Sequence, residues 1–474
     1  MSLERVDMSL IYALSSIIED SRAAFKDIMS EVEENTEDRH FIAAELVNTH
    51  DKERFDGATL IHGENLVAMG DNIVFMEELL KRGFKGKLAL IYIDPPFFSK
   101  ANYDAVLRLY SEKLKGSEAI KVFAYNDIWE HGLESYLRML TIRFLIMKEL
   151  LSDDGCFWIH LDWHVVHYVK IILDEIFGEK NFVNEVIWQY KSGGTSKRHY
   201  SRKHDTLLFY AKTDKYYFTP QTEKSYNRGY KPYRFKGVKE FKDETGWYTQ
   251  VNMKDVWQLD MVGRTSAERT GYATQKPESL LERIIQSCSK PDDICADFFG
   301  GSGTLAAVAN RMGRKFISCD SGTVASVSSV KRLAGAGASF AFCMADPGKS
   351  TGQASGLEVS AEVSPIELSD KWMLEIELKK YSPANREFPT DEKGKNILSM
   401  LIKEDSLSLI EYWSIDFDYD GVMHKADVLL ARDKNHLETR FRKIAKNFGR
   451  ISIVAVDAFG NRYYREFDPS GKNT

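Results

Sequence analysis

The stretch ICADFFGGSGTLAAVANRMGRKFISCD, residues 294–320, has the layout of a nucleoside-binding unit. Its apolar start predicts a strand that ends at Asp297, and a glycine turn then leads into a helix that should begin near Thr304. Glycines in such a turn allow positive φ and let a ligand approach the backbone closely. The second strand ends on Asp320, where a carboxylate can hydrogen-bond both hydroxyls of a ribose. Strand, turn, helix and strand in this order predict a parallel α/β sheet.

The spacing of the glycines differs from the dinucleotide-binding fingerprint. A G-x-G-x-x-G pattern counted from Gly301 requires a glycine at position 306, where Ala306 stands. The phenylalanines before the glycines indicate packing against an uncharged adenosine, whereas a phosphate cradle needs free amides that face an anion. A nicotinamide-dependent oxidoreductase is therefore disfavoured. A purely structural turn remains the alternative, because short motifs also match by chance.

A second stretch, LALIYIDPPFFSK at residues 88–100, joins a buried strand to an acidic residue and two prolines. The apolar run from Leu88 to Ile93 predicts the strand. Proline cannot continue a sheet ladder, so the chain must leave the sheet after Asp94. Asp-Pro is also a common turn opener, so these residues alone leave a plain turn with core aromatics as an equal alternative.

Strands and helices alternate along much of the chain around these two stretches. Helices are expected at 134–154, 165–178 and 276–289, and strands at 156–163 and 184–190. Such alternation predicts a mostly parallel sheet with helices on both faces.

The composition describes a soluble globular protein. The chain has 474 residues, 43% hydrophobic and 28% charged, and its length is enough for about three units. No stretch approaches the roughly 20 apolar residues of a membrane span, and early charges in the N-terminus disfavour a signal peptide. The five cysteines lack metal-ligand spacing and are expected to be buried thiols in a reducing compartment. We therefore expect a cytoplasmic protein with no membrane partner.

Charge is distributed unevenly, although the net charge is only −6. Residues 1–50 hold 4 Lys or Arg against 11 Asp or Glu, whereas residues 191–242 hold 14 against 4. A chain with one strongly basic segment fits a protein that touches a polyanion with one face. A solvated surface insertion is the alternative reading of the basic segment.

Two motifs and their order carry a resemblance to a known family. Asp-Pro-Pro-Phe at 94–97 is followed by the basic insertion and then by Asp-Phe-Phe-Gly-Gly-Ser-Gly-Thr at 297–304. This arrangement resembles the amino-methyltransferases of DNA, which use S-adenosylmethionine as methyl donor. The catalytic motif comes first, as in the permuted β class. The chain is similar above all to the adenine-specific modification (Mod) subunits of type III restriction systems.

Further matches extend the resemblance over about residues 60–335. They are GDN at 70–72, YLRML at 136–140 and TQKPESLLERII at 274–285. The resemblance weakens after Asp320, where SGTVASVSSVKRLAGAGAS stands in place of the family's usual helix.

The resemblance implies a fold and a division of the chain. The fold is expected to be α/β and Rossmann-like, that of an S-adenosylmethionine-dependent methyltransferase, with a mostly parallel seven-stranded sheet in permuted motif order. The expected parts are a helical acidic N-terminal arm (1–55), a catalytic half (56–190), an inserted target-recognition region (191–270), a cofactor-binding half (271–344) and, after a linker near 345, a smaller β-rich C-terminal domain (345–474).

The chemistry of the family gives the strand exit a catalytic role. The exocyclic nitrogen of adenine is a poor nucleophile because its lone pair is delocalised into the ring. Asp94 and the backbone carbonyl of Pro95 would each accept one N–H hydrogen bond, and Pro95 and Pro96 would hold both acceptors still. Phe97 would stack on a base flipped out of the duplex. A serine in place of Asp94 would have favoured cytosine N4, and no cysteine follows a proline, as methylation at cytosine C5 usually requires.

The resemblance also assigns the cofactor-binding residues. Asp320 would bind the ribose, Asp71 would lie near the adenine ring, and Lys276 and Pro277 would lie beside the methionine end. No metal is expected, and the histidine-rich run is interpreted as structural or DNA-facing. The residues expected around the methionine and adenosine moieties are Asp297, Phe299, Gly300, Gly303 and Thr304, and the histidine-rich run consists of His160, Asp162, His164 and His167.

The expected partner is double-stranded DNA, held by the basic insertion. The resemblance also allows a homodimer and a restriction (helicase-nuclease) subunit as partners. The alternatives to an active adenine-N6 methyltransferase are a non-catalytic DNA-recognition subunit and a cytosine-N4 methyltransferase. The residues expected to reach DNA are Lys197, Arg198, Arg202 and Lys203.

Overall fold

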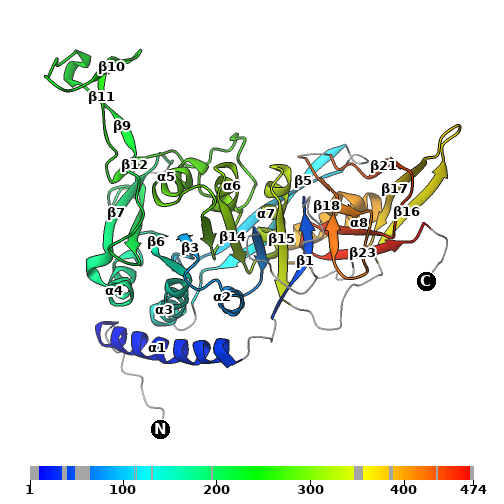
Figure 1. Cartoon of the computed structure of the whole chain (residues 1–474), viewed down its shortest axis with the longest axis horizontal. Coiled ribbons are helices and arrows are strands. Elements are labelled where there is room, and N and C mark those ends of the chain that lie inside the picture. The colour runs from blue at the N-terminus through cyan, green and yellow to red at the C-terminus, as the bar shows by residue number, and fades with distance from the viewer. Residues whose placement is uncertain are drawn as a thin grey trace, which may run out of the picture.

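A large central sheet organises the protein (Figure 1). The computed structural model describes residues 10–34, 40–48, 65–111, 113, 115–129, 132–193, 196–345, 356–383, 388–433 and 436–469. The strands of the sheet are, in spatial order, β12 (Val256–Gln258), β7 (Phe182–Gln189), β8 (His204–Ala211), β6 (Leu151–Leu161), β3 (Leu88–Ile93), β13 (Ile294–Asp297), β14 (Lys315–Asp320), β2 (Leu66–Met69), β15 (Phe340–Ala345), β1 (Phe41–Val47) and β19 (His424–Ala426).

Seven of these strands, from β7 to β2, form the mostly parallel sheet of a Rossmann-like methyltransferase fold. Only β8 runs antiparallel within this set, between β6 and β7. The sheet is wider than expected, because β12 extends one edge and β15, β1 and β19 extend the other. These additions are short edge pairings with segments far away in the chain, which local sequence patterns do not reveal.

Helices cover both faces of the sheet and bury two separate hydrophobic cores (Figure 1). Phe75, Leu140 and Leu173 belong to the first core, and Leu281, Leu305 and Val330 belong to the second. The apolar residues recur at helical spacing on one side of each helix, which is why each buries one face. The helices of the first face are α1 (Leu10–Glu34), α2 (Asn72–Lys81), α3 (Gly132–Leu150) and α4 (Val166–Phe177), and those of the second are α5 (Glu278–Cys288), α6 (Thr304–Arg311) and α7 (Thr323–Gly335).

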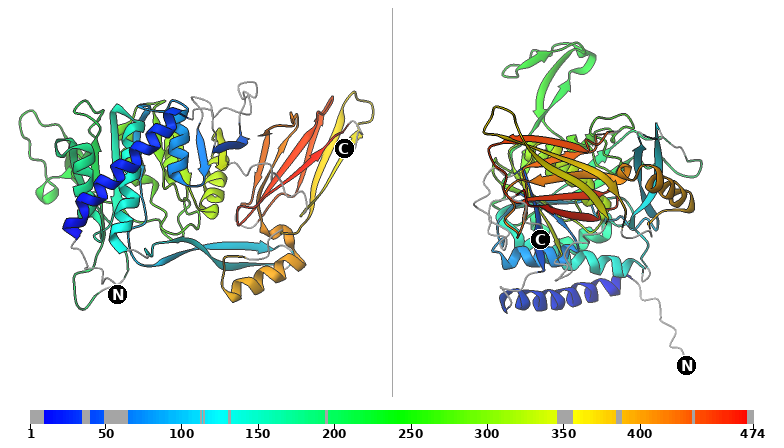
Figure 2. Two further views of the ribbon diagram at one scale, coloured as in Figure 1. Left: turned by 90° about the horizontal axis from the view of Figure 1, so that it is seen from below. Right: turned by 90° about the vertical axis from the view of Figure 1, so that its right-hand side faces the viewer.

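A β-rich unit follows the central sheet in the chain and has a third hydrophobic core. Its longest helix, α8 (Glu392–Glu404), contacts a two-stranded ribbon that follows β3 in the chain (Figure 2). The ribbon consists of β4 (Asn102–Ser111) and β5 (Gly116–Asn126). The strands of the unit are β16 (Leu357–Pro365), β17 (Trp372–Tyr381), β21 (Arg440–Ala445), β20 (Val428–Ala431), β18 (Ile410–Asp416), β22 (Ile451–Asp457) and β23 (Arg462–Phe467).

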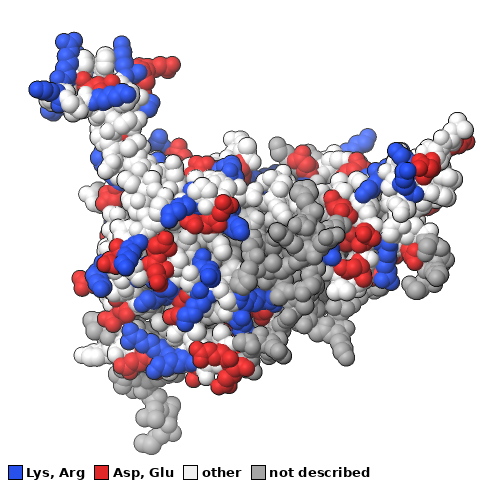
Figure 3. All heavy atoms as spheres, in the orientation of Figure 1, with Lys and Arg blue, Asp and Glu red and all other residues white. Residues whose placement is uncertain are grey.

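A small three-stranded arm projects from the body of the protein (Figure 1). It consists of β9 (Thr222–Tyr226), β10 (Glu240–Lys242) and β11 (Trp247–Asn252). Basic side chains gather on it, with acidic ones among them (Figure 3). The arm belongs to the basic region 191–270, but β8 and β12 of that region are strands of the central sheet. The region is therefore a loop and an arm that surround sheet strands rather than one continuous insertion.

Two further expectations need correction. Residues 1–55 are not a purely helical arm, because Phe41–Val47 forms β1 inside the sheet, between β15 and β19. A helix, α7, does form after Asp320, where the sequence departs from the family's usual pattern, because Val324, Val327 and Val330 bury one side of it. The linker expected after 345 lies largely outside the described residues. Within the described ranges, no helix is long and apolar enough to span a membrane.

Candidate active site

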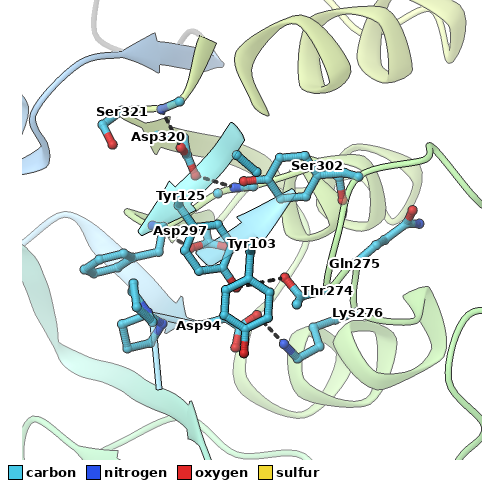
Figure 4. Close-up of a pocket in the computed structure, with 18 of the residues that line it drawn as sticks. Asp94, Tyr103, Tyr125, Thr274, Gln275, Lys276, Asp297, Ser302, Asp320 and Ser321 are labelled. Carbon is cyan, nitrogen blue, oxygen red and sulfur yellow. Dashed lines mark hydrogen bonds and ion pairs between the residues drawn. The ribbon is translucent and has the colours of Figure 1, made fainter. Parts of the chain in front are cut away.

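A cavity of about 810 Å³ lies where several parallel strands end (Figure 4). Asp71, Asp94, Asp162, Asp297 and Asp320 line it, and each stands at or just beyond the carboxyl end of a strand. Ligands of open α/β sheets bind at this edge, because the loops that leave the strands there can converge on one molecule. The cavity therefore joins the two stretches that the sequence singled out.

Asp94 lies at the end of β3, and its two carboxylate oxygens have different surroundings. The ammonium group of Lys276 pairs with Oδ2. Oδ1 is buried and has no hydrogen-bond partner among the described residues. A buried polar atom without a partner is costly and usually has a functional explanation. Asp94 therefore lines the cavity with one carboxylate oxygen that has no partner among the described residues, while Lys276 orients the carboxylate.

The backbone after Asp94 is fixed by several hydrogen bonds. Tyr136 Oη donates to the carbonyl of Pro96 at 2.7 Å. The buried carboxylate of Asp127 accepts from the backbone amides of Phe98 and Ser99 at 2.9 and 2.6 Å. Phe98 has a φ of 59°, which is unusual for a residue with a side chain. These contacts fix the backbone of the exit from β3 and so help to position Asp94.

Phe97 lines the cavity and rests on a buried histidine. Its ring stacks on that of His160, with centroids 5.8 Å apart and planes at 28°. His160 is fully buried, with its ring nitrogens 3.0 Å from Tyr92 Oη and 3.1 Å from Asp205 Oδ2. Tyr190 Oη donates to the other oxygen of Asp205 at 3.0 Å. His160 therefore supports the wall of the cavity, in agreement with a structural role.

The glycine turn after β13 brings backbone close to the cavity. A side chain at Gly300 would place its Cβ 2.2 Å from Ser318 Oγ, so any larger residue would require the Ser318 side chain to move. Gly301 has a φ of 51° and donates its amide to Asp320 Oδ2 at 2.8 Å. Gly300 and Gly301 both line the cavity. The turn is therefore an open cradle of backbone, as the glycines predicted.

Two carboxyl groups near this turn are buried, and burial raises the pKa of each. Burial raises the pKa of Asp297 well above its ordinary value, and the charges of Asp94 and Asp320 raise it further. Burial also raises the pKa of Asp320, although the amides of Gly301 and Gly322 both donate to its carboxylate. The carboxyl groups of Asp94, Asp297 and Asp320 together favour a ligand that carries hydrogen-bond donors or positive charge.

Asp71 caps helix α2 at the opposite side of the turn. Its side chain accepts from the amide of Ile73 at 2.7 Å, and Arg143 lies 3.6 Å from its carboxylate. Arg143 also donates to Asn72 at 2.6 Å, and Asn72 in turn donates to the carbonyl of Phe298 at 2.7 Å. This chain of contacts ties the start of α2 to the glycine turn.

The structure separates the predicted site residues into two groups. Pro277 and Gly303 do not line the cavity: Pro277 precedes α5, and Gly303 packs its backbone against Ser329. The other eleven residues assigned to catalysis or cofactor binding do line it together. They are Asp71, Asp94, Pro95, Pro96, Phe97, Lys276, Asp297, Phe299, Gly300, Asp320 and Thr304, the last at the start of α6.

The residues predicted to reach DNA lie outside the cavity, on the loop between β7 and β8. The guanidinium of Arg202 stacks on Trp163 at 3.7 Å from the ring centroid. Lys203 donates to Ser192 Oγ and to the carbonyl of Gly193, at 2.8 and 2.6 Å, and so closes the loop. Trp188 of β7, Tyr190 just after it and Asp205 of β8 contribute to the cavity on either side of the loop. The loop therefore rises from the rim of the cavity, and Lys197 and Arg198 belong to it as well.

Sequence reasoning missed the residues that the ribbon contributes. Tyr103 and Tyr125 line the cavity, as does Pro389 from the C-terminal part of the chain. Residues 102–126 were not recognised as a ribbon, although alternating apolar residues such as Ile120 and Val122 are a signal for a strand. The link between Lys276 and Asp94 was also missed, because it spans 182 residues. In the described part of the chain, no group of three or more His, Cys, Asp or Glu could hold a metal ion.

Comparison with known proteins identifies the family. A family model described as DNA methylase, which covers N6 and N4 methyltransferases, matches residues 88–326, about half of the chain. The type II methyltransferase M2.LlaDCHI of Lactococcus lactis subsp. cremoris is 33% identical over 268 residues, which cover 56% of this chain and 85% of that protein.

Two further proteins are similar to this chain, one over a shorter stretch and one at lower sequence identity. The probable type III restriction-modification enzyme HindVI Mod subunit of Haemophilus influenzae is 36% identical over 133 residues, or 28% of this chain and 15% of that protein. A crystal structure of the M1.HpyAVI–SAM complex is 19% identical with a TM-score of 0.36, and covers 56% of this chain and 98% of that one. The family match spans both the strand exit at Asp94 and the glycine turn. The chain therefore belongs to the N6/N4 DNA methylase family and is a DNA methyltransferase.

Proposed function

We propose that the protein transfers a methyl group from S-adenosylmethionine to the N6 amino group of an adenine flipped out of double-stranded DNA. One observation carries this proposal: Asp94 lines the cavity that also holds the glycine turn, and its Oδ1 is buried and unpartnered among the described residues. An oxygen of this kind can accept a hydrogen bond from an amino N–H. The aspartate at this position also favours adenine over cytosine N4, for which a serine would be expected.

The residues present fit both reactants. The cofactor supplies an electrophilic methyl group on a sulfonium sulfur, which leaves as the thioether of S-adenosylhomocysteine. Its cationic centre suits the acidic cavity, and its adenosine suits the open turn at Gly300 and Gly301. The ribose would lie at Asp320, and the adenine ring near Asp71 and Phe299.

On the target side, Asp94 and the carbonyl of Pro95 would accept the two hydrogens of the amino group. These two acceptors localise the lone pair of the nitrogen and aim it at the methyl carbon. Lys276 keeps the carboxylate of Asp94 oriented. Because the acceptors are held before the base arrives, little reorganisation remains for the transition state. As the N–C bond forms the C–S bond breaks, and the nitrogen would then pass one proton to solvent water; no covalent enzyme intermediate is needed.

Tritium transfer from labelled S-adenosylmethionine tests the proposed activity. The purified protein should label double-stranded DNA, and nucleoside analysis of that DNA should yield N6-methyladenine. Labelled N4-methylcytosine would overturn the adenine assignment and support the alternative base. No label in DNA would leave a non-catalytic recognition subunit as the better description. Single-molecule sequencing of DNA from an expressing host would then give the modified site.

Replacement of Asp320 by alanine should weaken S-adenosylmethionine binding by at least about tenfold, because hydrogen bonds to a charged group contribute roughly 1.5–3 kcal/mol each. DNA affinity should change much less. Asp320→Asn is the matched control, since it keeps an acceptor and the approximate shape of the side chain, so its loss should be smaller. Calorimetric titration with the cofactor measures both. An unchanged affinity in the alanine variant would remove Asp320 from the site.

The basic region 191–270 should hold the DNA. Substituting Lys197, Arg198 and Arg202 together by alanine should reduce the salt dependence of binding, with a change of about 0.9 in the logarithmic slope for each phosphate that the variant no longer neutralises. Fluorescence anisotropy at several salt concentrations measures this slope. Lys446→Ala, on an exposed pair in the C-terminal unit, is the control and should leave the slope unchanged. An equal slope in the triple variant would place the DNA elsewhere.

Recognition of the target sequence should also reside in this region. Arginine and lysine that reach base edges in the major groove favour guanine. An exchange of the loop 191–203 and the arm 212–255 with those of a relative of known site, while β8 is kept, should change the methylated sequence. If the parental site persists, recognition lies in the β-rich C-terminal unit instead. The relatives in restriction-modification systems support a role in such a system, with a homodimer or a restriction subunit as candidate partners.

A further inference from the structure

The ribbon of β4 and β5 brings two tyrosines to the cavity. Tyr103 and Tyr125 are partners in the strand register, and their rings stack with centroids 4.7 Å apart and planes at 16°. Both line the cavity, and Figure 4 shows them close to Asp94 and Thr274. A stacked pair of rings on a two-stranded ribbon forms a flat aromatic surface. No residue of this ribbon takes part in the chemistry described above.

The tyrosine pair stands at the end of the cavity where Asp94 lies. Tyr103 Oη donates to Ser99 Oγ at 3.0 Å, which ties it to the exit from β3. Tyr125 Oη is 3.4 Å from Thr274 Oγ1, two residues before the Lys276 that pairs with Asp94. Burial raises the pKa of Tyr125, and the charge of Asp94 adds to this shift. The pair is thus close to the proposed site of methyl transfer.

The β-rich C-terminal unit packs against the ribbon (Figure 2). Leu109 and Val122 are fully buried in the same hydrophobic core as Leu398 of α8. The amide of Phe123 donates to the carbonyl of Pro389 at 3.0 Å, and the hydroxyl of Thr390 donates to the carbonyl of Lys121 at 2.6 Å. Because the ribbon is anchored along one face, its cavity end has little freedom to move.

One face of Phe97 rests on His160, so a base bound at Asp94 would stack on the other face of Phe97. The opposite face of that base would then need a second wall. We propose that Tyr125, backed by Tyr103, is this wall and stacks on the flipped target base. Enzymes that act on flipped bases hold them between aromatic or apolar side chains. The inference rests on the proposed function and adds a substrate-binding residue to it. It also gives the C-terminal unit a part in forming the target-base site.

The test compares three variants on a duplex that contains the methylated site found by sequencing. Tyr125→Leu should lower kcat/KM for DNA by roughly tenfold or more, the loss expected when base–aromatic stacking is removed. Tyr125→Phe keeps the ring and should stay within about threefold of the wild type. Tyr110→Leu is the matched control, because Tyr110 is on the same ribbon but does not line the cavity.

A second readout separates stacking from a structural effect. With 2-aminopurine at the target position, the bound DNA should fluoresce more strongly in Tyr125→Leu than in the wild type, because an unstacked aminopurine is brighter. Cofactor affinity should be the same in all variants. The inference is overturned if Tyr125→Leu methylates as fast as the wild type, if its emission matches the wild type, or if its main loss is in cofactor binding. A wild-type protein that methylates no DNA would instead refute the proposed function.

Discussion

Replacing Asp94 with alanine is expected to abolish methyl transfer while cofactor binding is largely retained. The substitution removes the buried carboxylate oxygen that is free to bind the amino group. Removing a preorganised group that stabilises a transition state typically lowers kcat by about 100-fold or more. Steady-state kinetics with labelled cofactor measure kcat, and calorimetric titration measures binding. If the variant keeps more than about a tenth of wild-type kcat, equivalent to about 1.4 kcal/mol of barrier, Asp94 is not the acceptor.

The ion pair with Lys276 requires a control for this substitution. Asp94→Ala leaves the ammonium of Lys276 buried without its carboxylate, and this could lower stability independently of chemistry. The double variant Asp94→Ala with Lys276→Met removes both charges. It should unfold at a temperature closer to that of the wild type and remain inactive. Activity that returns in the double variant would mean that the buried ammonium, and not the lost acceptor, had caused the defect.

The largest effect on stability is expected at the buried pair of Glu45 and Arg462. Glu45 is fully buried in β1, and Arg462 in β23 donates to its carboxylate. Burial tends to raise the pKa of Glu45, but the charges of Arg462 and His424 outweigh it, so the pKa lies below its ordinary value. Arg462→Met should lower the free energy of unfolding by about 3–5 kcal/mol, because the buried carboxylate of Glu45 loses its guanidinium partner and keeps only the weaker support of Ser414 and His424.

Chemical denaturation measures this loss against a matched exposed pair. Arg442→Met removes the partner of Glu375, but the side chain of Arg442 is 62% exposed. Pairs of this kind contribute about 0–1 kcal/mol, so the control should be nearly neutral. The double variant Glu45→Gln with Arg462→Met should cost less than the sum of its single substitutions. Equal effects of Arg462→Met and Arg442→Met would contradict the importance assigned to the buried pair.

The sequence predicted the parts of the site that depend on local pattern. The strand before Asp94, the turn at Gly300 and the acid at Asp320 each follow from a few consecutive residues with a distinct physical signature. The order of the two motifs, which resembles that of a known family, then indicated that these parts belong to one site. For the same reason the central strands and the helices on either side of the sheet could be expected with little information beyond periodicity.

The parts that were missed depend on contacts between distant segments. FIAAELV, the sequence of β1, has no polar alternation that would predict a strand, and only its neighbours β15 and β19 make it one. The stacked tyrosines of the ribbon are ordinary strand residues until the fold brings them beside Asp94. Gly303 and Pro277 matched the family motif, yet they support the site through backbone shape and helix geometry instead of lining it.

The position of β1 has a consequence for synthesis on the ribosome. Its strand partners are β15 and β19, and Glu45 and Arg462 lie 417 residues apart. At about 5–20 residues per second, β1 waits roughly 20–80 s for residue 426 to be made. During that time its backbone edge and apolar side chains lack their final neighbours, which is a risk for aggregation. We expect the nascent chain to need chaperone protection and the sheet to close only when translation is nearly complete. A truncated chain that already contains Asp94 and the glycine turn would then be unable to modify DNA.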